Sequence, residues 1–425
     1  MTAVKVLVVG AGVGGLTTAL SLHAAGAEVV VVDAARTLLP LGVGINLQPH
    51  AVRELTELGL GDALEATGVQ TREMLRLDRH ANHIIGHDRG LFAGYSWPQY
   101  SIHRGELQML LLDAVVERLG PEAVRTGLIF ESYAEDEEGV EVALHARTGG
   151  APVRMRADVL VGADGISSAV RRQLHPGEGA PLWNGIRMWR GIAETDPFLT
   201  GRSMIVAGSH AHGRLVFYPI SKTAESRSRA LVNWVAEVRV TPETRLETET
   251  ADWTREGRLE DVLPYYADWD FGWMDVPRLI ADSPQILEYP MVDRDPLPYW
   301  SRGRVTLVGD AAHPMYPIGA NGGSLAIIDA RVLAWELSRT DDPVDALKAY
   351  EAARLDEANA VVLACRDMAA DRLLDTVAER APDGFAAISD VLTAAELTDM
   401  NDAWRRTTDM DTESLNSRPS WTPRR

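Results

Sequence analysis

The stretch VKVLVVGAGVGG, residues 4–15, decides the fold of this chain. An apolar run of strand length over residues 4–9 leads into a glycine-rich turn, and an apolar helical pattern follows over residues 16–25. A second β-branched run, residues 29–32, ends at Asp33, eighteen residues after Gly15. Strand, glycine turn, helix and strand in this order predict a βαβ unit with parallel strands, and therefore an α/β fold.

The glycine spacing predicts a dinucleotide site. Gly10 permits a tight turn, Gly12 lets a pyrophosphate approach the backbone, and Gly15 lets the helix pack closely on the strand. The phosphates then meet the positive end of the helix, and Asp33 can accept hydrogen bonds from a ribose. Glycine turns also occur simply to join a strand to a helix, but the complete unit with its terminal acid favours the dinucleotide interpretation.

Composition describes a folded chain with an acidic surface. The 425 residues are 46% hydrophobic and 24% charged, which excludes disordered and disulfide-scaffold classes and allows two or three domains. Lys and Arg total 42 against 61 Asp and Glu, so the net charge is 42 − 61 = −19. Such a surface repels phosphate backbones and anionic lipids, so we expect neither a nucleic acid nor a membrane partner.

Cysteine and histidine patterns indicate a protein without metal or disulfides. Cys365 is the one cysteine, which excludes an intrachain disulfide and fits a reducing, cytoplasmic location. The histidines show no helical i, i+4 pair, so we expect no metal site. The apolar N-terminus lacks a basic region before it and is broken by glycines, so it is not expected to be a signal peptide. Both a monomer and a homodimer remain open.

Two later motifs separate a flavoprotein from a simple NAD(P) dehydrogenase, which shares the βαβ unit. DVLVGADGISSAVR, residues 158–171, places an Asp-Gly pair after a buried strand, and GRVTLVGDAAHP, residues 303–314, places a Gly-Asp pair after another. With the first glycine motif, these segments resemble the three fingerprints of single-component FAD-dependent aromatic hydroxylases. MWRG at residues 188–191 and YPMVDRDP at residues 289–296 are similar to the phenazine hydroxylase branch, near 3-hydroxybenzoate 6-hydroxylases and salicylate hydroxylases.

The resemblance implies a set of cofactor-binding residues beyond the first motif. An arginine would meet the FAD pyrophosphate, with a glutamine nearby; a loop would follow the flavin edge; one acid would be shared between FAD and NAD(P)H, and another would hold the ribityl chain. A last loop would lie against the isoalloxazine ring, with a helix N-terminus beside it. These roles are carried over to Arg104, Gln108, Gly44, Asn46, Asp164, Gly309, Asp310, Pro317, Gly319, Asn321 and Gly322. Residues 320–323, Ala-Asn-Gly-Gly, depart from the commoner glutamine-containing run.

The resemblance also implies a substrate pocket in a sheet over the flavin. Its candidate lining residues are Trp189, Arg190, Tyr218, Trp234, Tyr316 and Pro317. Most tryptophans of this region are expected in the sheet core, and neighbours on a strand such as Trp189 and Arg190 face opposite ways. Tyr218 is the first candidate to orient a substrate, while no catalytic base can be assigned. His313 is expected to have a structural role.

The expected architecture is a Rossmann-like FAD-binding domain of the glutathione-reductase type with an inserted, mainly antiparallel β-sheet domain and a helical C-terminal region. The FAD-binding domain would comprise residues 1–73, 102–178 and 296–340, and the substrate-binding domain residues 74–101 and 179–295. Residues 341–405 would be helical, and residues 406–425 a flexible tail.

The function implied is an NAD(P)H- and O2-dependent FAD monooxygenase that hydroxylates a small aromatic molecule, phenolic, carboxylated or polycyclic, through a C4a-hydroperoxyflavin. Epoxidation, Baeyer–Villiger insertion and oxidative decarboxylation use similar flavin chemistry and stay open. The Trp-x-Trp-x-Ile-Pro segment of flavin halogenases is not found in the sequence. A binding protein that keeps the fold without catalysis is the alternative from another class, and the complete motifs argue against it.

Overall fold

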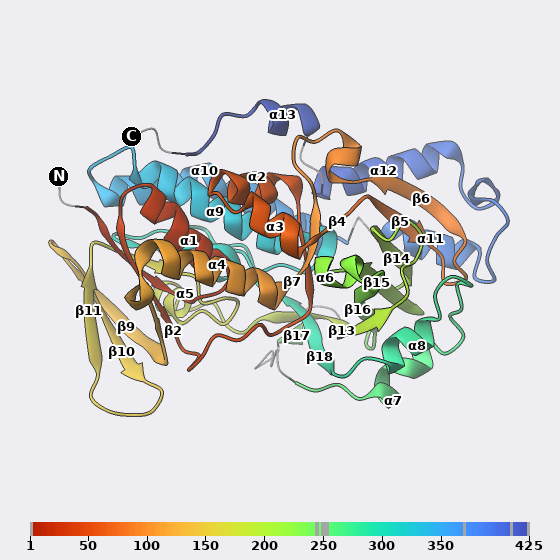
Figure 1. Ribbon diagram of the computed structural model, residues 1–425, viewed down its shortest axis with the longest axis horizontal. Helices are drawn as coiled ribbons and strands as arrows, with labels where there is room; N and C mark the ends of the chain where they lie inside the picture. Colours follow the sequence, from red (N-terminus) through yellow and green to blue (C-terminus); the bar gives the residue numbers. More distant parts are fainter. Residues whose placement is uncertain (1–2, 243–245, 248–254, 369–370, 409–410, 423–425) are drawn as a thin grey trace.

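The computed structural model describes residues 3–242, 246–247, 255–368, 371–408 and 411–422. It has a mixed α/β fold whose elements gather around two large sheets (Figure 1). The first is a five-stranded parallel sheet in the order β19-β12-β1-β2-β8. Its strands are β19 (Val305–Leu307), β12 (Val159–Gly162), β1 (Lys5–Val9), β2 (Glu28–Asp33) and β8 (Val124–Thr126).

Apolar helices cover this sheet. α1 (Val13–Ala24) packs on α4 (Arg104–Leu119) and α9 (Gly322–Leu337), and α9 also packs on α10 (Pro343–Arg366). Gly15 makes the approach of α1 to β1 possible, because a Cβ there would lie 1.9 Å from the carbonyl oxygen of Gly10. The strand, turn, helix and strand predicted from residues 4–33 are therefore observed.

The second large sheet is mainly antiparallel and has the order β17-β13-β16-β15-β14-β5-β6, with β18 also paired to β13. Two of its strands come from early in the chain, and the pairing of β5 with β14 is parallel. The strands are β5 (Glu73–Leu77), β6 (His83–Asp88), β13 (Leu182–Thr195), β14 (Ser203–Ser209), β15 (Gly213–Pro219), β16 (Ala230–Arg239), β17 (Leu246–Glu247) and β18 (Ile286–Asp293).

The two faces of the second sheet differ in character. One face packs a dense aromatic cluster against α8 (Val276–Ala281) and the segment before it. The other face contacts helices from the end of the chain, because α11 (Arg372–Arg380) packs on β14. The aromatic cluster includes Trp189, Phe217, Trp234, Tyr266 and Trp269.

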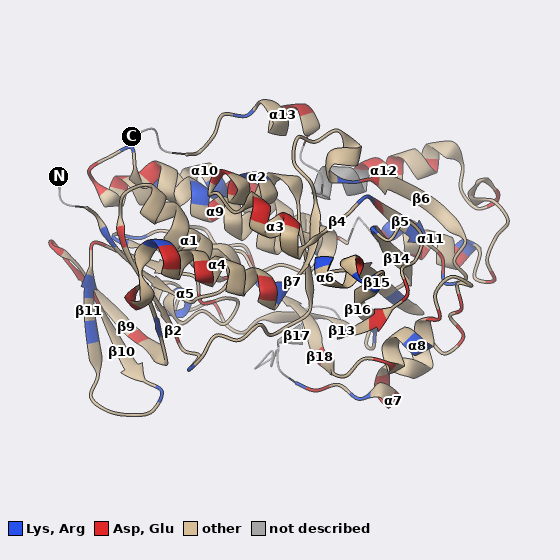
Figure 2. Ribbon diagram, viewed as in Figure 1, with Lys and Arg blue, Asp and Glu red and all other residues tan. Residues whose placement is uncertain are grey.

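Two three-stranded sheets complete the fold. β3 (Gly44–Leu47), β7 (Tyr100–His103) and β4 (Val69–Gln70) bring the segment after β2 to the start of α4. β9 (Leu128–Asp136), β10 (Gly139–Ala146) and β11 (Val153–Ala157) form a hairpin sheet. Figure 2 shows acidic residues spread over many helices and loops. Within the described residues, the helices are too short or too polar to cross a membrane.

The C-terminal segment corrects an expectation. The prediction of a flexible tail over residues 406–425 is wrong for residues 411–422, which follow α12 (Ala394–Thr408) and include α13 (Thr412–Ser417). Leu415 is fully buried, and Arg53 donates hydrogen bonds to the carbonyl oxygens of Leu415, at 2.9 Å, and Arg418, at 2.6 Å. The polar composition misled the prediction because the anchors are backbone carbonyls bound by a distant arginine. Residues 409–410 and 423–425 lie outside the described part.

Candidate functional site

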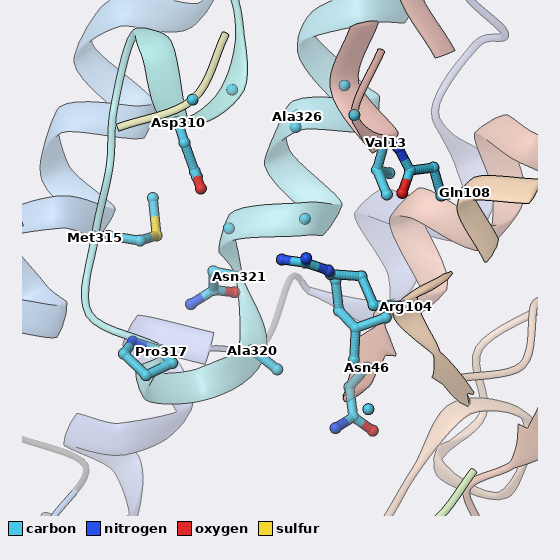
Figure 3. Close-up of a pocket in the computed structure, with 18 of the residues that line it drawn as sticks. Val13, Asn46, Arg104, Gln108, Asp310, Met315, Pro317, Ala320, Asn321 and Ala326 are labelled. Carbon is cyan, nitrogen blue, oxygen red and sulfur yellow. The ribbon is translucent and has the colours of Figure 1, made fainter. Parts of the chain in front are cut away.

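A cavity of about 850 Å³ extends from the carboxyl ends of the parallel strands to the second large sheet. The loops after β1, β2, β12 and β19 contribute to its walls, and so does the N-terminus of α9. Carboxyl ends of parallel strands are where α/β proteins bind nucleotides. Figure 3 shows Arg104 and Asp310 projecting into this space, with Asn321 at the start of α9 between them.

Of the three motif glycines, Gly12 has open space for a ligand beside it, whereas Gly10 and Gly15 are packed against the backbone. Gly10 has φ +109°, and a Cβ there would lie 2.4 Å from the carbonyl oxygen of Ala163. Gly15 touches Gly10 and does not line the cavity, which fits its predicted packing role. At Gly12, by contrast, no described atom would come within 4 Å of an added Cβ. Gly12 lines the cavity, so the open space there faces the candidate ligand.

Asp33 and Gln108 hold the same turn from two sides. The Asp33 carboxylate accepts hydrogen bonds from the backbone N–H groups of Ala11 and Ala35, each at 2.7 Å. The Gln108 side chain donates to the carbonyl oxygen of Ala11 at 2.7 Å. Both residues line the cavity. Each Asp33 oxygen keeps acceptor capacity toward the cavity, because a carboxylate oxygen can accept more than one hydrogen bond.

Arg104 presents a positive charge to the cavity. Its guanidinium packs against Gly42 and has no hydrogen-bond or ion-pair partner within the described part of the chain. Burial, with the charge of Arg190 nearby, lowers the pKa of Arg104. The Arg104 side chain is accessible from the cavity, so it can form a charge-assisted hydrogen bond with an anion that binds there. The N-terminus of the 16-residue helix α9 points into the same space and favours negative charge there.

Two acids line the cavity at strand ends, in different states. Asp164 supports the start of α5 (Ala169–Leu174): it accepts hydrogen bonds from the side chain of the N-cap residue Ser168 and, at 2.7 Å, from the N–H of Ala169. Asp310 has no hydrogen-bond or ion-pair partner in the part of the chain that the structure describes, and its exposed surface faces the cavity. Burial raises the pKa of both carboxyls. Asp310 is therefore free to accept a hydrogen bond from a ligand hydroxyl, while Asp164 is already bonded to the start of α5.

The turn that carries Asp310 is held from behind. The Asp329 carboxylate, fully buried in α9, accepts the N–H of Gly309 at 3.0 Å and pairs with His313 Nε2 at 2.5 Å. Arg354 Nε donates to its other oxygen at 3.0 Å. This network supports the structural role expected for His313. It also fixes the direction of Asp310, which follows Gly309 directly.

The loop before α9 forms another part of the cavity wall. Gly319 adopts φ +72° and Ala320 φ +58°, so the chain reverses tightly before the helix begins. Gly322 opens α9 with no described atom within 3.7 Å of an added Cβ. The predicted cofactor residues of this region that line the cavity are Gly309, Asp310, Pro317, Gly319, Asn321 and Gly322. Gly44 and Asn46, on the neighbouring β3, line it as well.

The second sheet supplies the rest of the lining from alternate positions of each strand. Because successive side chains on a strand point to opposite faces, one parity faces the cavity. These residues are Met74 and Arg76 on β5, Met204 and Val206 on β14, Arg214, Val216 and Tyr218 on β15, Val235 and Glu237 on β16, and Arg190 on β13.

The prediction that Trp189 and Trp234 line the substrate pocket is wrong. Both have the other parity and lie in the aromatic cluster on the far face, where Trp189 donates to Glu288 at 3.1 Å and Trp234 to Ser283 at 2.7 Å. Neither lines the cavity. Trp234 packs where Gly191 has no side chain, since a Cβ there would lie 2.6 Å from the indole. The sequence could not choose the inward parity from an aromatic-rich strand.

Arg190, Tyr218 and Tyr316 do line the cavity. Arg190 donates to the carbonyl oxygen of Gly44 at 2.9 Å and to the Tyr289 hydroxyl at 3.1 Å. Burial raises the pKa of Tyr218, whose hydroxyl bonds to Arg190 and Asn46. Tyr218 is therefore a neutral hydrogen-bonding group at neutral pH.

A buried ion cluster closes the end of the cavity away from the glycine turn. Arg214 pairs with Glu237 at 2.6 Å and with Asp371 at 3.1 Å, which ties the sheet to the start of α11. His210 Nε2 lies 2.8 Å from the same Glu237 oxygen. Burial alone would raise the pKa of Glu237, but Arg214 and His210 outweigh it and hold that pKa at about 2.

The Glu237 cluster predicts a pH-dependent stability. Glu237→Ala leaves Arg214 with less compensation and should cost about 3–5 kcal/mol of unfolding free energy at pH 7. The folded-state pKa is below the ordinary value of 4.5, so this stabilisation is present above pH 4.5 and is lost as the pH falls toward 2. Thermal melts of both proteins at pH 7 and pH 3.5 measure it. Glu138→Ala, on the exposed β9–β10 turn, is the control and should melt like the wild type. If Glu237→Ala lowers the melting temperature equally at pH 7 and at pH 3.5, the explanation by charge pairing is contradicted.

Several lining residues could not be found from the sequence. Arg76, Arg89 and Gln99 come from the 74–101 segment, and Asp371 from the C-terminal region. These residues belong to no motif and are brought to the cavity by strand pairing between distant segments, such as β5 with β14. The alternation Met74, Arg76 on a short strand was the one available signal.

Comparisons with known proteins agree with this geometry. The FAD binding domain family matches residues 3–364. The chain is 54% identical over 369 residues to phenazine 1,6-dicarboxylic acid hydroxylase PhzS of Lysobacter antibioticus, covering 86% of this chain and 90% of the relative. It is 34% identical to 3-hydroxybenzoate 6-hydroxylase 1 of Aquipseudomonas alcaligenes, covering 82% of this chain and 84% of that one.

Solved structures resemble the whole fold. HpxO of Klebsiella pneumoniae, in complex with FAD and uric acid, has a TM-score of 0.72 at 26% identity, covering 97% of this chain and 96% of that one. A salicylate hydroxylase substrate complex has a TM-score of 0.71 at 22% identity, covering 98% and 99% of the two chains, and supports the fold alone.

Proposed function

The chain belongs to the FAD-binding domain family, among its FAD-dependent aromatic hydroxylases, and on that premise we propose that it hydroxylates a planar, multi-ring aromatic carboxylate. It is a flavoprotein monooxygenase that uses FAD, with NAD(P)H and O2 as co-substrates.

The cavity fits FAD on grounds of its own. Gly12 leaves an open approach to backbone N–H groups. Arg104 offers a guanidinium and Asp310 a carboxylate, and neither group has a hydrogen-bond or ion-pair partner among the described residues. We propose that Gly12 and Arg104 hold the pyrophosphate, Asp33 the adenosine ribose and Asp310 the ribityl chain. The N-terminus of α9 would stabilise negative charge beside the ring system. Bound FAD supplies the transfer of one oxygen atom from O2, a reaction that no side chain performs.

The protein's own residues would position the substrate and keep water away. We propose that residues 1–73, 102–178 and 296–340 form the FAD-binding unit and that residues 74–101 and 179–295 present the substrate. The valines of β14, β15 and β16 form an apolar wall that excludes water from the reacting atoms. Tyr218, held by Arg190 and Asn46, can donate a hydrogen bond to a substrate oxygen.

One observation carries the substrate class. The cavity continues from the glycine turn onto an apolar floor that is bordered by buried arginines, which is the lining that a flat aromatic acid requires. The 54% identical relative is named for a phenazine dicarboxylic acid, which is such a molecule.

The proposal predicts substrate-dependent consumption of NAD(P)H. Purified holoenzyme is mixed with NADH or NADPH, and its oxidation is followed with phenazine carboxylates, hydroxybenzoates and uncharged phenols. We expect the rate to rise about tenfold or more with a phenazine carboxylate, since binding energy from the rings positions the reacting carbon. Mass spectrometry should find a product that has gained oxygen. Stimulation by uncharged phenols alone, or peroxide release without an oxygenated product, would contradict the proposed substrate class.

A further inference from the structure

Five cavity-lining residues form one row across five neighbouring strands. Their register is continuous: Arg76 pairs with Val206, Val206 with Val216, Val216 with Val235, and Val235 with Arg190. Each of the five lines the cavity. The row therefore consists of an apolar floor of three valines with an arginine at either end.

The dimensions of the row suit a flat ligand of several rings. Neighbouring strands lie about 4.8 Å apart, so four spacings separate the two arginine backbones by roughly 19 Å. Both side chains line the cavity, so the length that a ligand must span is shorter than the distance between the two backbones. β-branched valines present a low, even surface against which an aromatic ring can lie. A single-ring acid could reach one end only, whereas a three-ring acid can approach both.

The charges at the two ends are suited to anions. Arg190 donates to the Gly44 carbonyl and to the Tyr289 hydroxyl and also bonds to the Tyr218 hydroxyl, all of them neutral groups. Its buried Nε has no partner within the described residues. Arg76 is 2% exposed, and a second buried arginine that lines the cavity, Arg89, contacts Met74 on the same strand as Arg76. Arg214, which also lines the cavity, is paired with Glu237 and Asp371.

We propose that Arg76 and Arg190 anchor the two ends of a planar aromatic substrate that carries an anionic group at each end. Arg190 binds the group nearer the flavin loop, and Arg76 binds the one at the far end, with the rings over Val206, Val216 and Val235. This inference rests on the proposed function and narrows its substrate from aromatic acids to aromatic dicarboxylates. Arg76 is then a specificity-determining residue outside all of the sequence motifs.

The test measures binding to oxidised holoenzyme, so that it does not depend on turnover. Phenazine, phenazine-1-carboxylate and phenazine-1,6-dicarboxylate are titrated by calorimetry and by the perturbation of the flavin absorbance. We expect wild type to bind the dicarboxylate tightest. Arg76→Met should weaken the dicarboxylate by about 10- to 100-fold, to the level of the monocarboxylate, because one charge-assisted interaction is lost. Phenazine itself should bind unchanged.

Two further variants complete the comparison. Arg190→Met should also weaken the dicarboxylate, and the double variant should no longer distinguish the dicarboxylate from phenazine. Arg187→Met is the matched control: it lies on β13 with the opposite parity, is paired with Glu288 at 3.5 Å and does not line the cavity. It should leave all three affinities unchanged. FAD content and melting temperature of each variant verify that the fold is intact.

The outcomes separate this inference from the proposed function. If Arg76→Met weakens phenazine and the dicarboxylate equally, Arg76 is structural and the inference is wrong, while the proposed function stands. If wild type binds the monocarboxylate at least as tightly as the dicarboxylate, the inference is wrong and the proposed function again stands. If a yellow wild-type protein binds none of the three ligands, both the row and the proposed substrate class are overturned.

Discussion

Gly12→Val should yield a folded protein that purifies without FAD. The backbone of Gly12 has φ −75° and ψ −177°, a conformation that valine adopts readily, and no described atom lies within 4 Å of an added Cβ. Nothing in the protein itself therefore opposes the substitution. The new side chain would occupy the space through which a pyrophosphate reaches the backbone N–H groups of the turn.

The expected effect is large. Separating the phosphates from the turn removes one or two charge-assisted hydrogen bonds, so the Kd for FAD should rise about 100-fold or more. Titration of apoprotein with FAD, followed by flavin fluorescence, measures it, and circular dichroism reports the fold. Gly177→Val is the control, because Gly177 also has open space and no positive φ, and lies outside the cavity. Full FAD content in Gly12→Val would overturn the assignment of this turn to the pyrophosphate.

Asp310→Ala should also purify largely without flavin while keeping its fold. Asp310 projects into the cavity without a partner in the described part of the chain, so no protein contact is lost with its carboxylate. A hydrogen bond from a ribityl hydroxyl to this charged group is worth about 1.5–3 kcal/mol, and its loss should raise the Kd for FAD about 10- to 150-fold. The ratio of flavin to protein absorbance after purification is the measurement. Normal FAD content would contradict the ribityl assignment.

Replacing the Asp310 carboxylate by a neutral amide should stabilise the protein without FAD. Burial raises the pKa of Asp310, so its ionised form is disfavoured in the folded apoprotein. A raised carboxyl pKa means that stability falls as the pH rises from the unfolded-state value toward the folded-state value. Asp310→Asn apoprotein should therefore melt above wild-type apoprotein at pH 8, and the difference should shrink near pH 4. A lower melting temperature at pH 8 would show that Asp310 has a structural role.

The cofactor end of the site could be predicted from the sequence because its residues follow strands directly. Residues 4–33 form a local unit whose strand, glycine turn and helix lie next to one another in the chain. Asp164 and Asp310 follow β12 and β19, and in the parallel sheet β12 lies beside β1 and β19 lies beside β12. Parallel strands end at one edge, so residues that follow them must meet there. The local sequence was therefore sufficient to predict that these residues line one cavity.

The substrate end depends on pairing between distant strands, which local sequence does not contain. Trp189 and Trp234 were predicted to line the pocket, but their parity directs them to the opposite face. Arg76 reaches the cavity only because β5 inserts beside β14, more than a hundred residues later in the sequence. Asp371 arrives through the packing of α11. A shift of one residue in strand pairing would turn each of these strand side chains to the opposite face of the sheet, and a single sequence does not specify that pairing.

The central claim is that the cavity between the glycine turn and the second sheet binds FAD. An absorbance spectrum of the purified protein, with a titration of added FAD into any apoprotein, tests this claim most directly. The account predicts a yellow protein that binds one FAD per chain and whose flavin bands shift when an aromatic carboxylate is added. A colourless protein that takes up no FAD would contradict it.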